Sequence, residues 1–208
     1  MKIKICGMKF AENISQVGAL QPDFFGFIFY SKSKRFVGTD FSIDSIQHLP
    51  KSIKKVGVFV NESPESIVEK VKKFDLHIVQ LHGNESVADC RFLKEKNIKI
   101  IKAFHIDETF DFNILKTFEP VCDYFLFDTK TPDFGGSGKI FDWKLLDNYK
   151  LEKPFFLSGG LNLESIEKIK ELNYPMLVGL DFNSQLEDEN FKKNISKVTE
   201  VILETRKI

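Results

Sequence analysis

The sequence predicts one (β/α)8 TIM barrel domain spanning residues 1–208, and two observations lead to this prediction. Eight short apolar segments recur along the chain, with helical stretches between them. The segments are almost continuously apolar instead of alternating, as expected for parallel strands covered on both faces. An open doubly wound sheet is the competing prediction, but no Gly-x-Gly-x-x-Gly follows the first segment, which favours the barrel.

The elements follow one another in a regular order. The expected strands are residues 2–6, 24–29, 55–60, 77–81, 99–104, 124–128, 155–157 and 176–181. Helix starts are indicated by Ser63 before Pro64, by Ser86 and by Asn162, because such side chains cap the first turn of a helix. A polar helix is expected at residues 11–20, and an amphipathic helix at 187–202 closes the chain.

Composition excludes several classes of protein. The formal net charge is zero, so no charge imbalance points to nucleic acid or to an anionic membrane. No run approaches the 18 or so apolar residues that a transmembrane helix requires. Three widely spaced cysteines have no zinc-like spacing, which is typical of a reduced, cytoplasmic protein. Both a monomer and a homodimer remain open.

Polar residues gather where the expected strands end, and barrel enzymes place their active sites at this rim. Cys6 ends the first strand and is followed by Gly7, which makes it a usable base or nucleophile. The other strand-end candidates are residues 30–35, Asn61, Gln80, His82, Lys102, His105, Asp128, Ser158, Gly159, Gly160, Asp181, Asn183 and Ser184.

Glycine-rich stretches follow the sixth and seventh strands, at 135–138 and 158–160. Glycine lets backbone N–H groups approach an anion closely, and phosphate sites of these barrels usually follow strands seven and eight. Loops also use glycine for ordinary reasons, so the stretch at 158–160, where position and composition agree, is the more specific indication of a phosphate site.

Several candidates also have ordinary structural explanations. Asp128 could cap the following turn, Arg35 could lie in a solvated loop, and His82 could be a turn residue. Gln80 could point into the barrel mouth or into the wall. Cys90 and Cys122 are interpreted as packing residues.

An ordered series of motifs spans almost the whole chain. The chain resembles the phosphoribosylanthranilate isomerase family of tryptophan biosynthesis. The motifs are Lys4-Ile-Cys-Gly7, Gly26-Phe-Ile-Phe-Tyr-Ser-Lys-Ser-Lys-Arg35, Lys55-Val-Gly-Val-Phe-Val-Asn61, Val79-Gln-Leu-His-Gly83, Ile101-Lys-Ala-Phe104, Phe127-Asp128, Gly135-Gly-Ser-Gly138, Phe141-Asp-Trp143 and Leu157-Ser-Gly-Gly160.

The resemblance implies an Amadori rearrangement of an aminoaldose phosphate, without cofactor or metal. Cys6 would be the general base, Asp128 the general acid, and Arg35 would hold the anthranilate carboxylate. The phosphate is expected at Gly159 and Gly160, together with Asn183 and Ser184 from the loop after strand eight. The remaining substrate contacts are expected from Gln80, His82, Ser158 and Asp181, with Gly135 and Gly136 in a covering loop.

Two further expectations concern details of this site. Asp128 must be partly protonated near neutral pH to donate a proton, so its pKa should be raised. After strand eight, Asn183 and Gln185 replace the Ser and Gly of the commoner family pattern. Because Gln tolerates left-handed geometry poorly, the phosphate contacts there are expected to be rearranged.

Other functions stay possible on sequence alone. Ribulose-phosphate epimerase shares the architecture but needs metal-binding His and Asp residues, of which only His82 is clear. Indole-glycerol-phosphate synthase needs catalytic Lys and Glu residues, and only Lys102 is present. A non-catalytic thiol sensor would use Cys6 as an oxidisable group and would need a resolving cysteine nearby.

Overall fold

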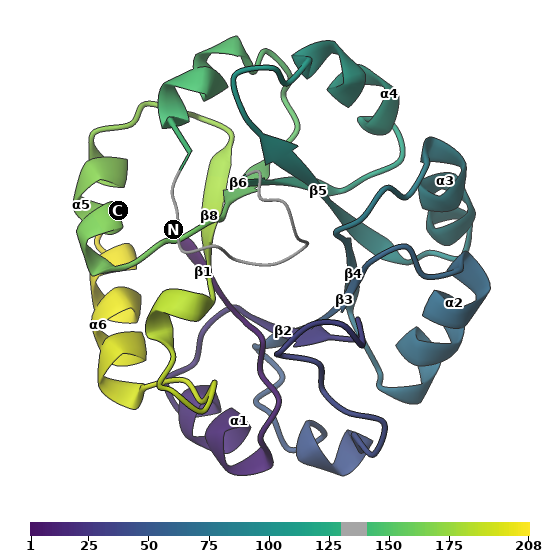
Figure 1. Cartoon of the computed structure of the whole chain (residues 1–208), viewed down its shortest axis with the longest axis vertical. Coiled ribbons are helices and arrows are strands. Elements are labelled where there is room, and N and C mark those ends of the chain that lie inside the picture. Colours follow the sequence, from purple (N-terminus) through teal and green to yellow (C-terminus); the bar gives the residue numbers. More distant parts are fainter. Residues whose placement is uncertain (130–140) are drawn as a thin grey trace.

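The computed structural model describes residues 1–129 and 141–208, and the strands of this part close into a parallel barrel (Figure 1). The strands are β1 Lys2–Cys6, β2 Phe24–Ile28, β3 Lys54–Phe59, β4 Ile78–Leu81, β5 Lys99–Ile106, β6 Tyr124–Thr129, β7 Phe155–Leu157 and β8 Leu177–Phe182. Each strand pairs with its neighbours in sequence, and β1 pairs with β8. The predicted barrel is therefore confirmed, and the open sheet is excluded.

Helices lie outside the ring of strands, as Figure 1 shows. The α-helices are α1 Ala11–Gly18, α2 Pro64–Lys73, α3 Val87–Glu95, α4 Leu115–Phe118, α5 Leu163–Lys170 and α6 Ile195–Thr205. Short 3-10 helices occupy other connections: η1 Ile43–Ser45, η2 Phe112–Ile114, η3 Trp143–Asn148 and η4 Ser184–Leu186. Between β2 and β3 only η1 forms, in a segment that contains Gly38, whose φ of +100° no helix adopts, and Pro50.

The helix caps agree with the sequence at three places. The side chains of Ser63, Ser86 and Asn162 each accept a hydrogen bond from the backbone N–H three residues later. Each cap satisfies a donor that the first turn of a helix leaves without an intrahelical partner.

The helix predicted at residues 187–202 begins too early. In the structure Asn194 is the N-cap, and α6 starts at Ile195. Residues 187–193 instead fold back, because Phe191 has a φ of +61° and Glu187 forms an antiparallel bridge with Lys193. This reversal of the chain brings the charged side chains of Glu187 and Lys193 towards the barrel mouth.

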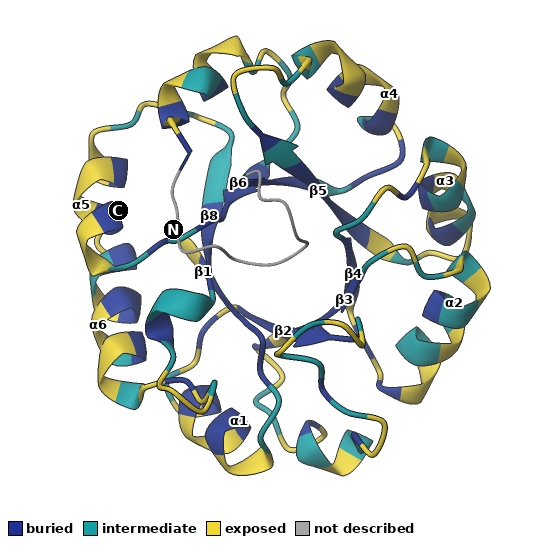
Figure 2. Cartoon of the chain, in the orientation of Figure 1, coloured by how far each residue is buried: buried dark blue, intermediate teal, exposed yellow. Residues whose placement is uncertain are grey.

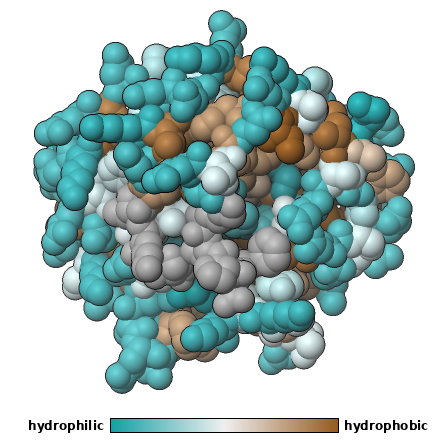
Figure 3. All heavy atoms as spheres, turned by 45° about the horizontal axis from the view of Figure 1, so that its top comes forward, coloured by the Kyte–Doolittle hydropathy of each residue, from teal (hydrophilic) through white to brown (hydrophobic). Residues whose placement is uncertain are grey.

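Buried apolar residues form two main clusters. Figure 2 shows that the buried residues lie along the strands and on the helix faces turned towards them. The larger cluster lies between the strands and the surrounding helices. A smaller cluster fills the barrel interior with Phe24, Val56, Ile78, Ile101, Ala103, Leu126 and Phe156. Hydrophilic side chains cover most of the face seen in Figure 3. No described helix is both long and apolar enough to cross a bilayer.

An ion pair lies inside the barrel where β1 meets β8. Lys4 and Asp181 are register partners, and the Lys4 Nζ donates to both carboxylate oxygens at 2.9 Å. Lys4 is fully buried and Asp181 is 4% exposed. Burial acts to lower the pKa of Lys4, but the Asp181 carboxylate and the Cys6 sulfur outweigh it and raise this pKa. Lys4 is therefore a fixed positive charge beneath the rim.

We predict that Lys4→Met lowers the free energy of unfolding by about 3–5 kcal/mol, because Asp181 is left buried without its cation. Lys55→Met is the matched control. Lys55 also binds an aspartate, Asp75, but that side chain is 74% exposed, so this loss should cost about 1 kcal/mol or less. Urea unfolding followed by circular dichroism measures both. Equal losses would contradict this account of the interior pair.

Candidate active site

A pocket opens at the carboxyl ends of the strands. All the predicted site residues that the structure describes line it: Cys6, Arg35, Gln80, His82, Asp128, Ser158, Gly159, Gly160, Asp181, Asn183 and Ser184. Gly135 and Gly136 lie outside the described residues. Three other strand-end candidates, Asn61, Lys102 and His105, do not line the pocket.

Cys6 ends β1 and faces the pocket from the barrel wall. The thiol is buried, and burial raises its pKa, although the nearby Lys4 ammonium acts in the opposite direction. Gly26, its register partner on β2, makes room for the sulfur, since a Cβ at Gly26 would lie 2.5 Å from the Cys6 Sγ. In the free protein Cys6 is therefore a thiol held next to a cation.

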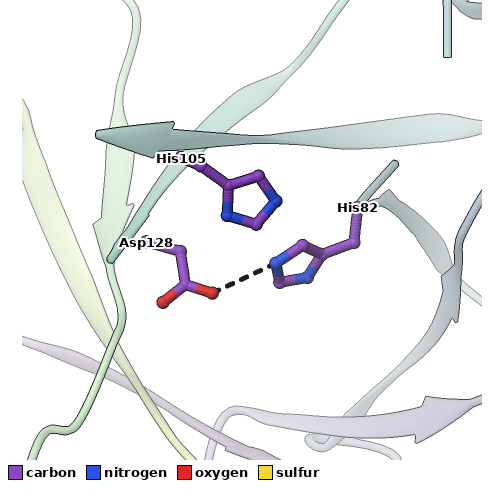
Figure 4. Close-up of side chains that lie close together, drawn as sticks. All are labelled: His82, His105 and Asp128. Carbon is purple, nitrogen blue, oxygen red and sulfur yellow. Dashed lines mark hydrogen bonds and ion pairs between the residues drawn. The ribbon is translucent and has the colours of Figure 1, made fainter. Parts of the chain in front are cut away.

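Asp128 on β6 uses its two carboxylate oxygens differently. Oδ1 accepts the backbone N–H of Thr129 at 2.9 Å, which resembles the expected capping role. Oδ2 lies 3.1 Å from the His82 Nε2 (Figure 4). Burial acts to raise the pKa of Asp128, but the His82 hydrogen bond and the charges of His82 and His105 outweigh it and lower this pKa. The expected raised pKa is therefore wrong for the free protein.

Gln80 points into the barrel mouth, which answers the question that the sequence left open. Its side chain is fully buried, and its Nε2 lies 2.8 Å from the His82 Nδ1. Both ring nitrogens of His82 are thus engaged, one by Gln80 and the other by Asp128. The sequence places Gln80 and His82 two residues apart at the end of β4, and the three side chains form a hydrogen-bonded chain across the rim.

Arg35 is an inward-facing residue, and the solvated-loop explanation is wrong. The Arg35 Nε and Nη2 donate to both carboxylate oxygens of Glu187, at 2.6–2.9 Å. The Arg35 side chain is 13% exposed and that of Glu187 4%. No described residue bonds the Arg35 Nη1 atom. A planar, two-pronged donor at the pocket wall suits a carboxylate ligand.

Glu187 is held in turn by Lys193. The Lys193 Nζ lies 2.6 Å from the Glu187 Oε1 and 2.8 Å from the Asn183 Oδ1. The Asn13 side chain of α1 fixes the backbone of Lys193, donating to its carbonyl and accepting from its N–H. The sequence does not indicate Glu187 and Lys193 as site residues, because their segment is predicted to be helical. No pattern in that segment signals a buried lysine.

Two consecutive glycines with positive φ form one corner of the pocket. Gly159 and Gly160 have φ values of +92° and +66°, a region that side chains with a Cβ rarely occupy. A Cβ at Gly159 would lie 2.8 Å from the Asp128 Oδ1, so this residue also leaves space for that carboxylate. Successive backbone N–H groups in such turns form concave anion sites.

The loop after β8 departs in sequence from the commoner family pattern. Its backbone nevertheless carries less strain than this departure suggests. Neither Asn183 nor Gln185 has a positive φ, because residues 184–186 form the 3-10 helix η4. The Asn183 Oδ1 is bonded by Lys193, however, and does not simply face the pocket. Ser184, at the start of η4, lines the pocket beside it.

Fold and site together define a barrel enzyme that carries out acid–base chemistry on a small anionic ligand. A family model described as N-(5'-phosphoribosyl)anthranilate (PRA) isomerase matches residues 3–204. The chain belongs to this family. The isomerase of that name from Parabacteroides distasonis is 46% identical over 206 residues, which cover 97% of this chain and 92% of that protein.

Solved structures agree with this assignment. The crystal structure of the isomerase from Thermotoga maritima matches with a TM-score of 0.88 at 34% identity, covering 100% of both chains. A PRA isomerase in complex with reduced 1-(o-carboxyphenylamino)-1-deoxyribulose 5-phosphate matches with a TM-score of 0.85 at 30% identity, also over 100% of both chains.

Lys193 gives a pH-dependent prediction. Burial lowers its pKa from 10.5 to about 8, although Glu187 acts in the opposite direction. Between pH 8 and 10.5 the unfolded chain therefore binds more protons than the folded chain, so this group makes stability rise with pH. Below pH 8 the lysine is protonated in both states and adds no pH dependence.

We predict that the free energy of unfolding of the wild type, relative to Lys193→Met, increases by about 1–3 kcal/mol from pH 8 to 10.5. Chemical denaturation at several pH values measures this difference. A difference that stays constant or decreases over the same range would show that Lys193 has an ordinary pKa.

Proposed function

We propose that this protein converts N-(5'-phosphoribosyl)anthranilate into 1-(2-carboxyphenylamino)-1-deoxyribulose 5-phosphate, an Amadori rearrangement in tryptophan biosynthesis. One observation carries the proposal: Cys6 from β1 and Asp128 from β6 face the same pocket from different strands. Membership of the isomerase family supports it. Acid and base groups alone account for the reaction, so the proposal requires no cofactor.

Asp128 is the proposed acid of the first step. It gives a proton to the furanose ring oxygen as the bond from this oxygen to C1 breaks, which opens the ring to an iminium ion. The His82 Nε2 lies 3.1 Å from the Asp128 Oδ2. His82 is placed to pass a proton to Asp128, and the hydrogen bond with Gln80 keeps the imidazole in position. The substrate's phosphate and carboxylate also favour the protonated acid.

Cys6 is the proposed base of the second step. The iminium ion acidifies the proton on C2, and the Cys6 sulfur removes it as the electron pair forms the C1–C2 double bond of an enolamine. A proton then returns to C1 as the C2 hydroxyl loses its own, which gives the ketone. The ammonium groups of Lys4 and Lys193 both lower the cost of forming the thiolate.

The pocket provides a separate place for each part of the substrate. A phosphate of about −1.5 to −2 charge fits the glycine corner at Gly159 and Gly160, next to Ser158 and Ser184. The anthranilate carboxylate would bind Arg35, which Glu187 holds in place. The apolar wall of Ile28, Val58 and Tyr30 is suited to the aromatic ring. Asp181 stays paired with Lys4 below.

The thiol-sensor alternative receives no support from the arrangement of the cysteines. Cys90 and Cys122 are both buried. Neither lines the pocket that contains Cys6. A resolving cysteine next to Cys6, which a sensor of this kind needs, is not found among the described residues.

Location and assembly stay predictions. We expect a cytoplasmic protein that binds a phosphorylated aminosugar and neither nucleic acid nor membrane. A relative from Thermotoga maritima is described as a dimeric isomerase, and it matches this chain with a TM-score of 0.84 at 30% identity. Whether this chain is a monomer or a homodimer can be measured by light scattering.

The function is tested with freshly made phosphoribosylanthranilate, whose loss is followed by fluorescence. Wild type should consume it rapidly, while Cys6→Ser and Asp128→Asn should each lower kcat by a factor of about 100 or more, because each removes a proton-transfer group. Matched circular dichroism spectra control for folding. Absence of turnover by the wild type would overturn the proposed isomerase activity. Turnover by all three proteins would keep the function and remove these two residues from its mechanism.

Gly26 gives an independent test of the position of Cys6. Gly26→Ala would place a methyl group 2.5 Å from the Cys6 Sγ, so the sulfur must move, and kcat should fall about tenfold or more.

Gly57→Ala on β3 is the matched control. Its methyl group would meet Leu76 at 2.5 Å, and Leu76 belongs to the larger cluster between strands and helices. This variant should lower the unfolding midpoint without a comparable loss of kcat. If both variants lost kcat equally, displacement of Cys6 would not be the cause.

A further inference from the structure

Three donor side chains converge at the rim of the barrel, as Figure 4 shows. His82 follows β4, His105 lies on β5 and Asp128 lies on β6, so three consecutive strands each contribute one group. His105 and Asp128 are register partners in neighbouring strands. One donor atom from each of the three lies within 4.8 Å of the other two. The mechanism proposed above uses His82 and Asp128 but has no role for His105.

We propose that His82, His105 and Asp128 form a binding site for a divalent transition-metal ion, with Zn²⁺ as the best-suited occupant, and that the bound ion blocks the active site. Two imidazoles and one carboxylate are a ligand set that Zn²⁺, Co²⁺ and Ni²⁺ accept. Mg²⁺ prefers oxygen ligands and keeps much of its water, so it should not compete.

The distances are close to those that a tetrahedral ion needs. With metal–ligand bonds of about 2.0–2.1 Å, neighbouring ligand atoms lie about 3.3 Å apart. The His82 Nε2 and the Asp128 Oδ2 are already 3.1 Å apart. The rings of His82 and His105 have centroids 5.2 Å apart and planes inclined by 34°. The three donor atoms lie within 4.8 Å of one another, so the third must move closer by about 1.5 Å at most to reach this spacing.

Gln80 supplies the support that a metal-bound imidazole needs. A metal on the Nε2 of His82 requires the ring proton on Nδ1, where it must find an acceptor. The Gln80 amide lies 2.8 Å from this Nδ1. Its Oε1 atom is buried and has no hydrogen-bond partner among the described residues. Turning the amide presents Oε1 to the Nδ1–H, so the same residue can support both the acid–base form and the metal-bound form of His82.

The consequence for turnover rests on the proposed function. An ion that binds Asp128 and His82 prevents proton donation to the ring oxygen. It should therefore inhibit the isomerase, and the substrate and the ion should exclude one another from the mouth of the pocket.

Binding is measured first, without reference to activity. The full-length wild-type protein is titrated with Co²⁺, which gives strong visible absorption in a four-coordinate site, and with Zn²⁺ by calorimetry. We expect one ion per chain. His105→Phe keeps a planar ring but removes a ligand, so it should abolish the Co²⁺ spectrum and weaken Zn²⁺ at least about tenfold. His48→Phe changes an exposed histidine outside the site and should bind as the wild type does.

Inhibition is then measured with both variants. Zn²⁺ should inhibit the wild type and His48→Phe. The Zn²⁺ concentration needed for the same inhibition of His105→Phe should be at least about tenfold higher. Because His105 also influences the neighbouring Asp128, the inhibition of each variant is expressed relative to its own kcat without added metal. Should His105→Phe fold poorly, His105→Asn serves as a second variant with the same expected loss of binding.

Equal Zn²⁺ affinity in wild type and folded His105 variants would overturn the proposed metal site. Turnover without Zn²⁺ binding rejects the metal site alone, whereas Zn²⁺ binding without turnover rejects the isomerase alone.

Discussion

Closure of the barrel between β1 and β8 is the constraint on which the site depends. The first and last strands pair in parallel, with Lys2 opposite Gly179 and Ile5 opposite Phe182. This pairing sets Lys4 against Asp181 inside the barrel, so the two ends of the chain are held together by a buried ion pair. It also brings the strand-end Cys6 of β1 and the loop after β8 to the same rim as Asp128. An open sheet would separate these groups.

Buried charges around this rim are arranged in pairs, because an isolated ion in a low-dielectric interior is very unfavourable. Lys4 pairs with Asp181, Lys193 with Glu187, and Lys102 with Glu85. The last pair braces the loop after β4, where the Lys102 Nζ also donates to the Gly83 carbonyl at 2.8 Å. With most charges fixed in this way, the few polar groups that face the pocket determine its chemistry.

In the free protein, Cys6 is a protonated thiol and Asp128 is an ionised carboxylate. The proposed proton transfers need the reverse, a thiolate at Cys6 and a protonated Asp128. Burial raises the pKa of the Cys6 thiol, whereas the His82 hydrogen bond overcomes burial and lowers the pKa of Asp128. Charge brought by the substrate is therefore part of the catalytic site. The phosphate and the carboxylate favour protonation of Asp128, and the iminium ion formed after ring opening favours the thiolate. Substrate binding thus prepares the acid, and ring opening prepares the base.

The barrel and its rim could be predicted from the sequence because both depend on local patterns. Near-continuous apolar segments identify the strands, and a polar residue at the end of each segment marks the rim. The Glu187–Lys193 bridge could not be predicted in this way, because its charges are buried by contacts with Asn13 and Arg35, which are distant in sequence.

The approach of His105 to His82 and Asp128 has a similar cause. His105 is predicted to be a strand-end residue, but it does not line the pocket. The distances among the three donors depend on strand register, which no local pattern reports. The low pKa of Asp128 follows from the same neighbours, and the sequence could show only that a carboxyl group ends the strand.

The most direct test of the division between acid and base is a kinetic isotope effect with substrate deuterated at C2. Asp128→Asn should make ring opening rate-limiting, so its residual rate should show an isotope effect close to one. Cys6→Ser should make removal of the C2 proton rate-limiting and give a large normal isotope effect. A large effect in Asp128→Asn together with none in Cys6→Ser would contradict the roles assigned here.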